Sequence, residues 1–257
     1  MSGELAATRL PFYRNPLRLA FSGSLWRALG FLVGYIVLSG VLFSVAVTVV
    51  STVTALSFTL LGLPLAIAAA TVVHWCASME RVRLRPLFEE PVTATYAALP
   101  DRGLVARVVA CWRNRATWRE LAYMVGMFGP LLAIDTAVFA IWAWFVSWIT
   151  LPLWYWAPWL DYHGRRIHGY QLGFYFPHGP DGPGTVGVFV DTLPKALLAA
   201  AAGIVGFLIF NYVLVATARM HARVARAMLR TPADPLAEVK TVIGEPGPLG
   251  SLHHTAS

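Results

Sequence analysis

The longest uncharged stretch of this chain lies between Arg27 and Glu80, where no Asp, Glu, Lys or Arg occurs. A membrane-spanning helix needs roughly 20 apolar residues, so this stretch is long enough for two helices. Basic residues flank it on both sides, which the positive-inside rule assigns to the cytoplasm. The sequence therefore predicts a hairpin of two spans, at about 28–50 and 54–78, with a turn near Ser51–Ser57.

The composition supports a membrane location. Hydrophobic residues make up 57% of the chain and charged residues 13%, whereas an ordinary soluble domain is roughly 25% charged. Two further apolar runs, at about 121–145 and 196–217, bring the predicted spans to four. The first run is far longer than the apolar core of a signal peptide, roughly 7–15 residues, so we expect it to be retained. The predicted fold class is an all-α integral membrane protein with four transmembrane helices.

The two ends of the chain have different compositions from the spans. Residues 1–27 combine arginines with apolar side chains, and Pro11 and Pro16 prevent one continuous helix. We expect this amphipathic segment to lie on the anionic lipids of the inner leaflet, which accounts for the formal charge of +7 without nucleic acid. Residues 231–257 are rich in Pro, Gly and small residues and are predicted to be a disordered cytoplasmic tail. The two cysteines, Cys76 and Cys111, are expected to stay reduced and to form no metal framework.

The central segment 80–120 holds eight of the twenty basic residues and is predicted to be the main cytoplasmic loop. Apolar residues at helical spacing between Leu104 and Trp112 predict an amphipathic helix. This helix is interpreted either as a connector lying on the membrane or as a docking surface for a partner. Thr117 and Glu120 have the spacing of a capping box, which predicts that a helix begins there.

The third predicted span contains two irregularities. Gly129-Pro130 is expected to kink it, because proline removes a hydrogen bond and clashes with the preceding turn. Asp135 is a lone acid in an apolar span, where it costs at least about 2.5–3.5 kcal/mol, so it is a functional candidate. The alternative is a structural carboxyl bonded to hydroxyls such as Thr136 or to a neighbouring helix.

A polar segment at about 151–194 follows and is predicted to lie outside the membrane. It begins in an aromatic belt that includes Trp154 and Trp156, residues typical of membrane interfaces. Strand-like segments at Tyr170–Phe176 and Val186–Val190 predict a small extracytoplasmic β-hairpin. Acids and histidines in this segment are candidate metal ligands, although their spacing matches no strong zinc pattern; they are Asp161, His163, His168, His178 and Asp181.

The fourth span is predicted to continue as a helix beyond the membrane. Asp191 or Thr192 is expected to cap it, with Pro194 in its first turn. Four arginines follow at spacings of four, three and four residues, which places them on one face as a candidate signal-output face: Arg219, Arg223, Arg226 and Arg230. His221, on the same helix, is interpreted as an ordinary juxtamembrane residue.

The two halves of the chain share an internal repeat. Trp26–Gly34 matches Trp118–Gly126, and Leu63-Pro64-Leu65 matches Leu151-Pro152-Leu153. The sequence therefore reads as a duplicated hairpin. Both copies are expected to start on the cytoplasmic side, so the repeats are predicted to be parallel. Inverted repeats would have favoured an alternating-access transporter.

These motifs together resemble a known family. The Trp-Arg-x-Leu start of each repeat, the Met79-Glu80-Arg81 exit, Leu151–Trp156 and Val190–Leu197 are similar to the sensor domain of actinobacterial membrane histidine kinases. The resemblance covers roughly residues 26–230. It implies a free-standing sensor domain that needs a separate kinase or other effector, because no phospho-acceptor motif or nucleotide-binding box follows Arg230.

The preferred interpretation is a non-enzymatic sensor or regulatory module in the cell membrane, with both termini cytoplasmic and no cofactor. A transporter or transporter subunit is the alternative, based on Asp135 and the kinked span. A membrane metalloenzyme is a third and weaker reading. The expected partners are the lipid bilayer, an effector protein and a second copy of the chain.

Overall fold

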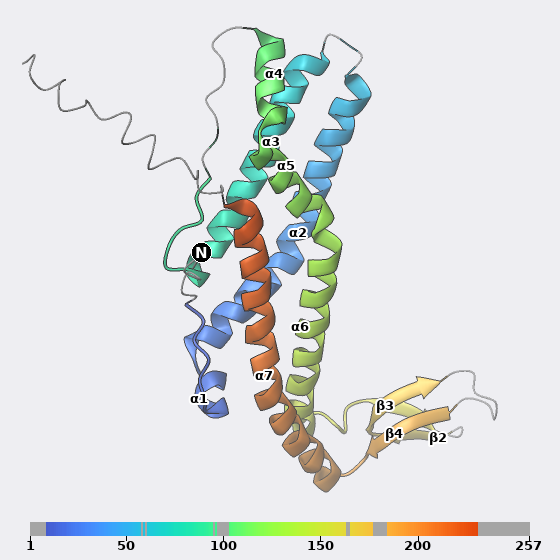
Figure 1. The fold of residues 1–257 in the computed structure, drawn as a ribbon. Coiled ribbons are helices and arrows are strands. Elements are labelled where there is room, and N and C mark those ends of the chain that lie inside the picture. Colours follow the sequence, from blue (N-terminus) through green and yellow to red (C-terminus); the bar gives the residue numbers. More distant parts are fainter. Residues whose placement is uncertain are drawn as a thin grey trace, which may run out of the picture.

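A computed structural model describes residues 9–57, 59, 61–94, 96, 103–162, 165–176 and 184–230 (Figure 1). Within them, four helices are long and apolar enough to cross a membrane. They are α2 (Gly23–Leu56), α3 (Gly62–Leu84), α6 (Phe128–Thr150) and α7 (Leu193–Leu229). The predicted all-α membrane fold is confirmed.

Shorter elements connect these helices. The helical ones are α1 (Pro16–Ala20), η1 (Arg85–Leu87), α4 (Leu104–Arg113), α5 (Arg115–Leu121), the π-helical turn η2 (Ala122–Gly126) and η3 (Leu151–Leu153). The strands are β1 (Trp159–Tyr162), β2 (Arg165–His168), β3 (Tyr170–Phe176) and β4 (Gly184–Val190).

The first hairpin turns later than its sequence suggested. Helix α2 continues through the expected turn to Leu56, and α3 begins at Gly62. A Cβ atom at Gly62 would lie 2.6 Å from the carbonyl oxygen of Leu56. Glycine therefore allows α3 to begin directly against the end of α2.

The amphipathic helix predicted in the central segment is confirmed as α4, whose Leu104 and Val105 are exposed. The capping box predicted at Thr117 is wrong. Asn114 caps α5 instead, because its side chain accepts a hydrogen bond from the amide of Ala116. The Thr117 hydroxyl, in the first turn of the helix, donates to the carbonyl of Cys111.

The irregularity expected at Gly129-Pro130 lies several residues earlier. The π-helical turn η2 separates α5 from α6, and the amide of Met127 bonds to the carbonyl of Ala122. Pro130 falls in the first turn of α6, where the missing N–H of proline costs no intrahelical hydrogen bond. The break is therefore a wide helical turn rather than a proline kink.

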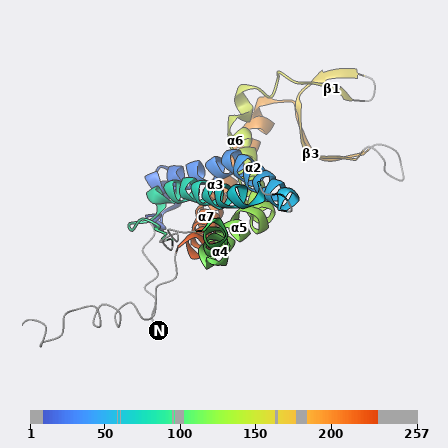
Figure 2. The same ribbon diagram turned by 90° about the horizontal axis from the view of Figure 1, so that it is seen from above.

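The strands form two antiparallel pairs. The predicted hairpin is confirmed as β3 and β4, with Tyr170 opposite Val190 and Phe176 opposite Gly184. The pair β1–β2 was not predicted, and it places Trp159 opposite His168. Figure 2 shows these strands to one side of the helices.

The two helical hairpins meet with their open ends overlapping. Along α2, Tyr35 lies beside His221 of α7, whereas Phe43 stacks on Phe128 at the start of α6. Because His221 also contacts Asp135 of α6, α2 and α6 run antiparallel. The α2–α3 turn and the strands consequently lie at opposite ends (Figure 1). The parallel arrangement predicted for the repeats is wrong here. Polar side chains near the open end of one hairpin pair with polar side chains near the open end of the other, and these contacts hold the hairpins antiparallel.

Helices α6 and α7 pack closely through glycines. A Cβ atom at Gly203 would lie 2.8 Å from Cβ of Trp148, and one at Gly206 would lie 2.3 Å from the ring of Phe145. The large aromatic residues of α6 thus occupy space that small residues of α7 leave open. This contact fixes how α7 lies against α6.

Candidate functional site

Asp135 lies near the middle of α6 and is completely buried. Its Oδ2 atom is 2.6 Å from Nδ1 of His221 on α7. The bond to a neighbouring helix offsets part of the cost of a carboxyl group in an apolar span. The structural interpretation of Asp135 expected a bonding partner on a neighbouring helix, and His221 is that partner. A functional role for Asp135 stays a prediction.

His221 is also completely buried, so its interpretation as an ordinary juxtamembrane residue is wrong. The rings of Phe31 and Tyr35 of α2 contact the imidazole edge-on, at centroid distances of 5.0 and 4.4 Å. Its second nitrogen, Nε2, lies 3.3 Å from the hydroxyl of Tyr123. Both ring nitrogens therefore have partners inside the protein.

The contact between Asp135 and His221 contains one proton whichever partner carries it. A carboxylate and an unprotonated nitrogen both only accept hydrogen bonds, so a 2.6 Å approach needs a proton between them. Because Asp135 and His221 are both completely buried, this proton is held away from water.

Tyr123 connects this pair to α3. Its hydroxyl donates to Oε2 of Glu80 at 3.4 Å, and the same oxygen accepts from Nη2 of Arg83 at 2.7 Å. Arg83 also donates to the carbonyl of Phe31, and its guanidinium lies 4.0 Å from that ring's centroid. The Asp135 branch of the network therefore joins α6, α7, η2, α3 and α2.

The other carboxylate oxygen of Glu80, Oε1, is buried and has no partner among the described residues. The same is true of the hydroxyl of Ser39. Both residues line a small cavity of about 10 Å³, together with Tyr35 and Tyr123. A cavity of this size is at the lower limit for one water molecule.

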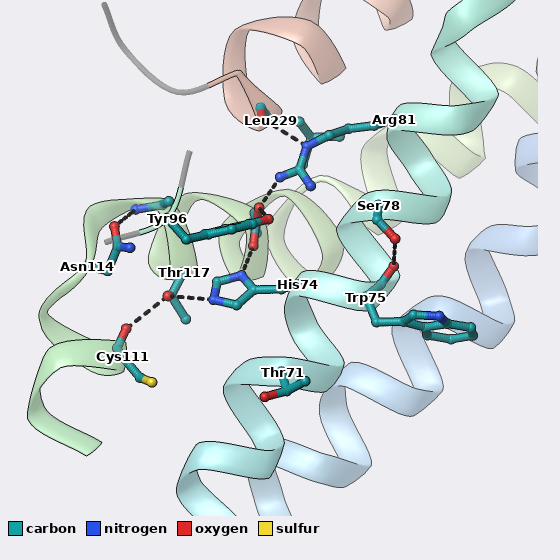
Figure 3. Close-up of polar contacts among 12 residues, drawn as sticks. Thr71, His74, Trp75, Ser78, Arg81, Tyr96, Cys111, Asn114, Thr117 and Leu229 are labelled. Carbon is teal, nitrogen blue, oxygen red and sulfur yellow. Dashed lines mark hydrogen bonds and ion pairs between the residues drawn. The ribbon is translucent and has the colours of Figure 1, made fainter. Parts of the chain in front are cut away.

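A second branch surrounds Glu120 at the end of α5 (Figure 3). Its carboxylate accepts hydrogen bonds from Arg81 and from the hydroxyl of Tyr96, the latter at 2.7 Å, and lies 2.5 Å from Nδ1 of His74. Arg81 also donates to the carbonyl of Leu229 at the end of α7. Burial and the nearby Glu120 carboxylate raise the pKa of Tyr96 to about 12, so its hydroxyl remains a donor.

The two branches meet at adjacent residues of α3, Glu80 and Arg81, both buried. Removing one member of a buried ion pair is strongly destabilising, by about 3–5 kcal/mol, because the other charge is left uncompensated. The network therefore ties the positions of the long helices to one another. Sequence reasoning proposed only Asp135 as a functional residue of this network. It missed His74, Glu80, Glu120 and His221, whose partners include side chains on other helices.

The predicted arginine face of α7 is divided by the structure. Arg219 donates to the carbonyl of Leu10 and stacks on Phe12, and Arg226 pairs with Glu90 at 3.3 Å. Those two arginines thus bind other segments of the chain. Arg223 and Arg230 are exposed, and no described residue pairs with them.

The aromatic candidates near the strands have structural contacts. Trp154 donates to the hydroxyl of Thr150 and packs edge-on against Tyr170. Trp156 is exposed, and its carbonyl oxygen lies 2.8 Å from Nδ1 of His168. Both arrangements hold the start of the strand region against the end of α6.

The predicted metal ligands are not brought together by the structure. Asp161 lies opposite Arg166 in the register of β1 and β2. His163, His178 and Asp181 lie outside the described residues. In the part of the chain that the structure describes, no group of three or more His, Cys, Asp or Glu residues is placed to hold a metal ion.

Comparison with known proteins gives one family. The model of the family described as "Putative sensor" matches residues 31–229. No curated protein and no solved structure gives a significant match. The matched region includes both branches of the network, the strands, all of α3, α6 and α7, and α2 from Phe31 onward. The chain therefore belongs to this sensor family.

Proposed function

We propose that this chain is a non-enzymatic sensor module of the cell membrane that passes a stimulus to a separate effector protein. The observation that carries the proposal is the continuity of α7. This helix of 37 residues begins directly after β4, passes the buried Asp135–His221 pair and ends at the exposed arginines. One rigid element thus joins the strand region to the network and to the opposite end of the second hairpin.

The start of α7 is packed against the strand region. Val190 of β4 is buried in one cluster with Leu151 and with Ala196 and Ala199 of α7. A stimulus that favours one position of the strands therefore favours one position of α7. A preference of about 1–3 kcal/mol is enough for useful coupling between two sites.

The network restricts how α7 can respond. His221 is bonded to Asp135 and Tyr123, and the carbonyl of Leu229 is bonded to Arg81. A rotation or translation of α7 must break these contacts or move their partners. The network can therefore act as the bistable element between stimulus and output.

We place the exposed arginines at the end of α7 in the cytoplasm. Basic residues between α3 and α6 and after the fourth span support this orientation. Arg223 and Arg230 are then available to acidic groups of an effector such as a kinase, or to anionic lipids of the inner leaflet.

Co-purification from the native membrane tests the proposal. The tagged chain is crosslinked in its host, purified and analysed by mass spectrometry, and a signalling protein is the expected partner. The double variant Arg223→Ala/Arg230→Ala should lose this partner, whereas Arg115→Ala, which removes an exposed arginine of α5, should retain it. Recovery of a transport ATPase, or of no partner at all, would contradict the proposal.

One observation favours a transporter as a second candidate. Asp135 and His221 share a buried proton, and buried acids carry protons in transporters. A transporter reconstituted in liposomes would give a flux of protons or of a proton-coupled solute that Asp135→Asn stops. A sensor module gives no flux in the same liposomes.

A further inference from the structure

A cavity of about 430 Å³ lies where the strands meet the helices. It is bounded by α6, α7, β3 and β4, and its lining includes Trp144, Trp148, Leu172, Val188, Lys195 and Ala202. Small-molecule sites are typically about 300–1,000 Å³ and mostly apolar, with few polar groups. This cavity has the size and lining of such a site.

The packing of α6 against α7 builds the cavity. Trp144 and Trp148 contact each other edge-on, with ring centroids 4.9 Å apart. On the facing helix the residues are small: Ala199 and Ala202 line the space, and Gly203 lies where a Cβ would meet Trp148. Large rings on one helix and small residues on the other leave room between them.

Two residues of the lining carry polar groups. The indole nitrogen of Trp148 is buried and has no hydrogen-bond acceptor among the described residues. An unmatched buried donor costs about 1–3 kcal/mol, which an acceptor on a bound molecule would recover. Lys195 is the one charged residue of the lining, and its ammonium group is half exposed and 2.7 Å from the carboxylate of Asp191.

We propose that this cavity binds one acyl chain of an anionic amphiphile, with the head group at Lys195. The apolar lining suits a hydrocarbon chain, and each buried CH₂ group contributes about 0.8 kcal/mol. Lys195 supplies the cation for the head group, and the exposed Asp191 can turn to water when the anion takes its place.

The bound chain would lie between Val188 of β4 and Ala202 of α7 and so contact both elements of the proposed relay. That the bound chain acts on this relay rests on the sensor function proposed above. The binding itself does not, because it is measured on the purified chain without an effector.

Quenching of tryptophan fluorescence by brominated chains measures the binding. The full chain is reconstituted in neutral nanodiscs and titrated with dibromostearate, and in a second arm it is reconstituted with increasing brominated phosphatidylglycerol. We expect saturable quenching in at least one arm. The neutral methyl ester of dibromostearate should bind more weakly, and Lys195→Met should remove the difference between acid and ester.

Filling the cavity provides the matched comparison. Ala202→Phe, which places a ring in the cavity, should weaken the apparent affinity at least about tenfold. Ala201→Phe makes the same change at an exposed neighbour outside the lining and should leave it unchanged. Val188→Phe fills the cavity from β4 without adding a tryptophan to the fluorescence readout, and it replaces Ala202→Phe if that variant does not fold.

The outcome assigns the source of the chain. Quenching by the free acid indicates a soluble fatty acid, and quenching by phosphatidylglycerol indicates a bilayer lipid. Equal quenching in the Ala202→Phe and Ala201→Phe proteins, equal affinity for an acid and an ester that both bind, or no saturable quenching in either arm would overturn the proposal. If the brominated chains do not bind but an effector still co-purifies, this site alone is refuted. If the chains bind but no effector co-purifies, the sensor function alone is refuted.

Discussion

Substitution of the buried pair in α6 and α7 tests the energetic role of the network. In Asp135→Leu, Nδ1 of His221 loses the oxygen that lies 2.6 Å away, and no water reaches the site because both residues are completely buried. Removing one partner of a buried charged pair costs about 3–5 kcal/mol. We therefore expect Asp135→Leu and His221→Leu each to lower the free energy of unfolding by about 3 kcal/mol.

The double variant Asp135→Leu/His221→Leu should recover much of this loss. It leaves no unpaired group at the contact, and apolar residues in place of a buried pair are often neutral or stabilising. Coupling between residues in direct contact amounts to about 0.5–3 kcal/mol. We expect a value at the upper end, about 3 kcal/mol, so that the double variant loses no more stability than either single variant.

The assay is reversible unfolding in mixed micelles, followed by circular dichroism at 222 nm for the wild type, both single variants and the double variant. Thr136→Ala, next to Asp135 on α6, serves as the control for a substitution outside the contact. If the double variant loses as much as the two single variants together, the pair has no coupling energy, and the reasoning fails.

The remaining predictions concern orientation and titration. Single cysteines at Thr59 and Val188, both exposed, should respond differently to a membrane-impermeant maleimide added outside intact cells. The α2–α3 turn and the strands lie at opposite ends of the structure (Figure 1), so we expect Val188→Cys to react and Thr59→Cys to stay protected. Reaction of both cysteines from outside would show that the hairpins are parallel in the membrane, as the distribution of basic residues favours. The hydrogen bond from Lys195 holds the pKa of Asp191 below its ordinary value of 3.8, so its small stabilising contribution is present above that value and lost as pH falls through the lower, folded-state pKa. A carboxyl titration by NMR should show the pKa returning toward 3.8 in Lys195→Met, and an unchanged pKa would contradict this cause.

Local patterns explain the parts of the fold that could be predicted. The uncharged run from Arg27 to Glu80 is long enough for two spans and flanked by charge, and it forms α2 and α3. Alternating apolar and aromatic residues around a Pro- and Gly-rich segment gave the pairing of β3 with β4. In both cases the information lies within a short stretch of sequence.

Contacts between distant helices explain what was missed. His221 follows exposed and charged neighbours, and its partner Asp135 is 86 residues away. A signal was nevertheless present, because Leu214, Ala218, His221 and Ala225 repeat at spacings of three and four and are all completely buried. This apolar stripe continues past the expected end of the span, so a polar residue within it required a partner. Which partner it has depends on how the hairpins pack, and the sequence contains no local signal for that.

The π-helical turn η2 has a consequence for the register of the second hairpin. One residue of α-helix corresponds to about 100° of rotation and 1.5 Å of rise, and η2 contains one residue more than an α-helical turn. Deleting the partly exposed Val125 would let α5 and α6 join as one α-helix. Glu120 would keep its position beside Arg81, while α6 from Phe128 onward would turn by about 100°. If α7 keeps its contacts with α2 and α3, this rotation carries Asp135 away from His221. The extra residue therefore sets the rotation of Asp135 on α6 relative to Glu120 on α5. A change between π and α geometry at this turn would exchange one set of side-chain neighbours for another without unfolding either helix.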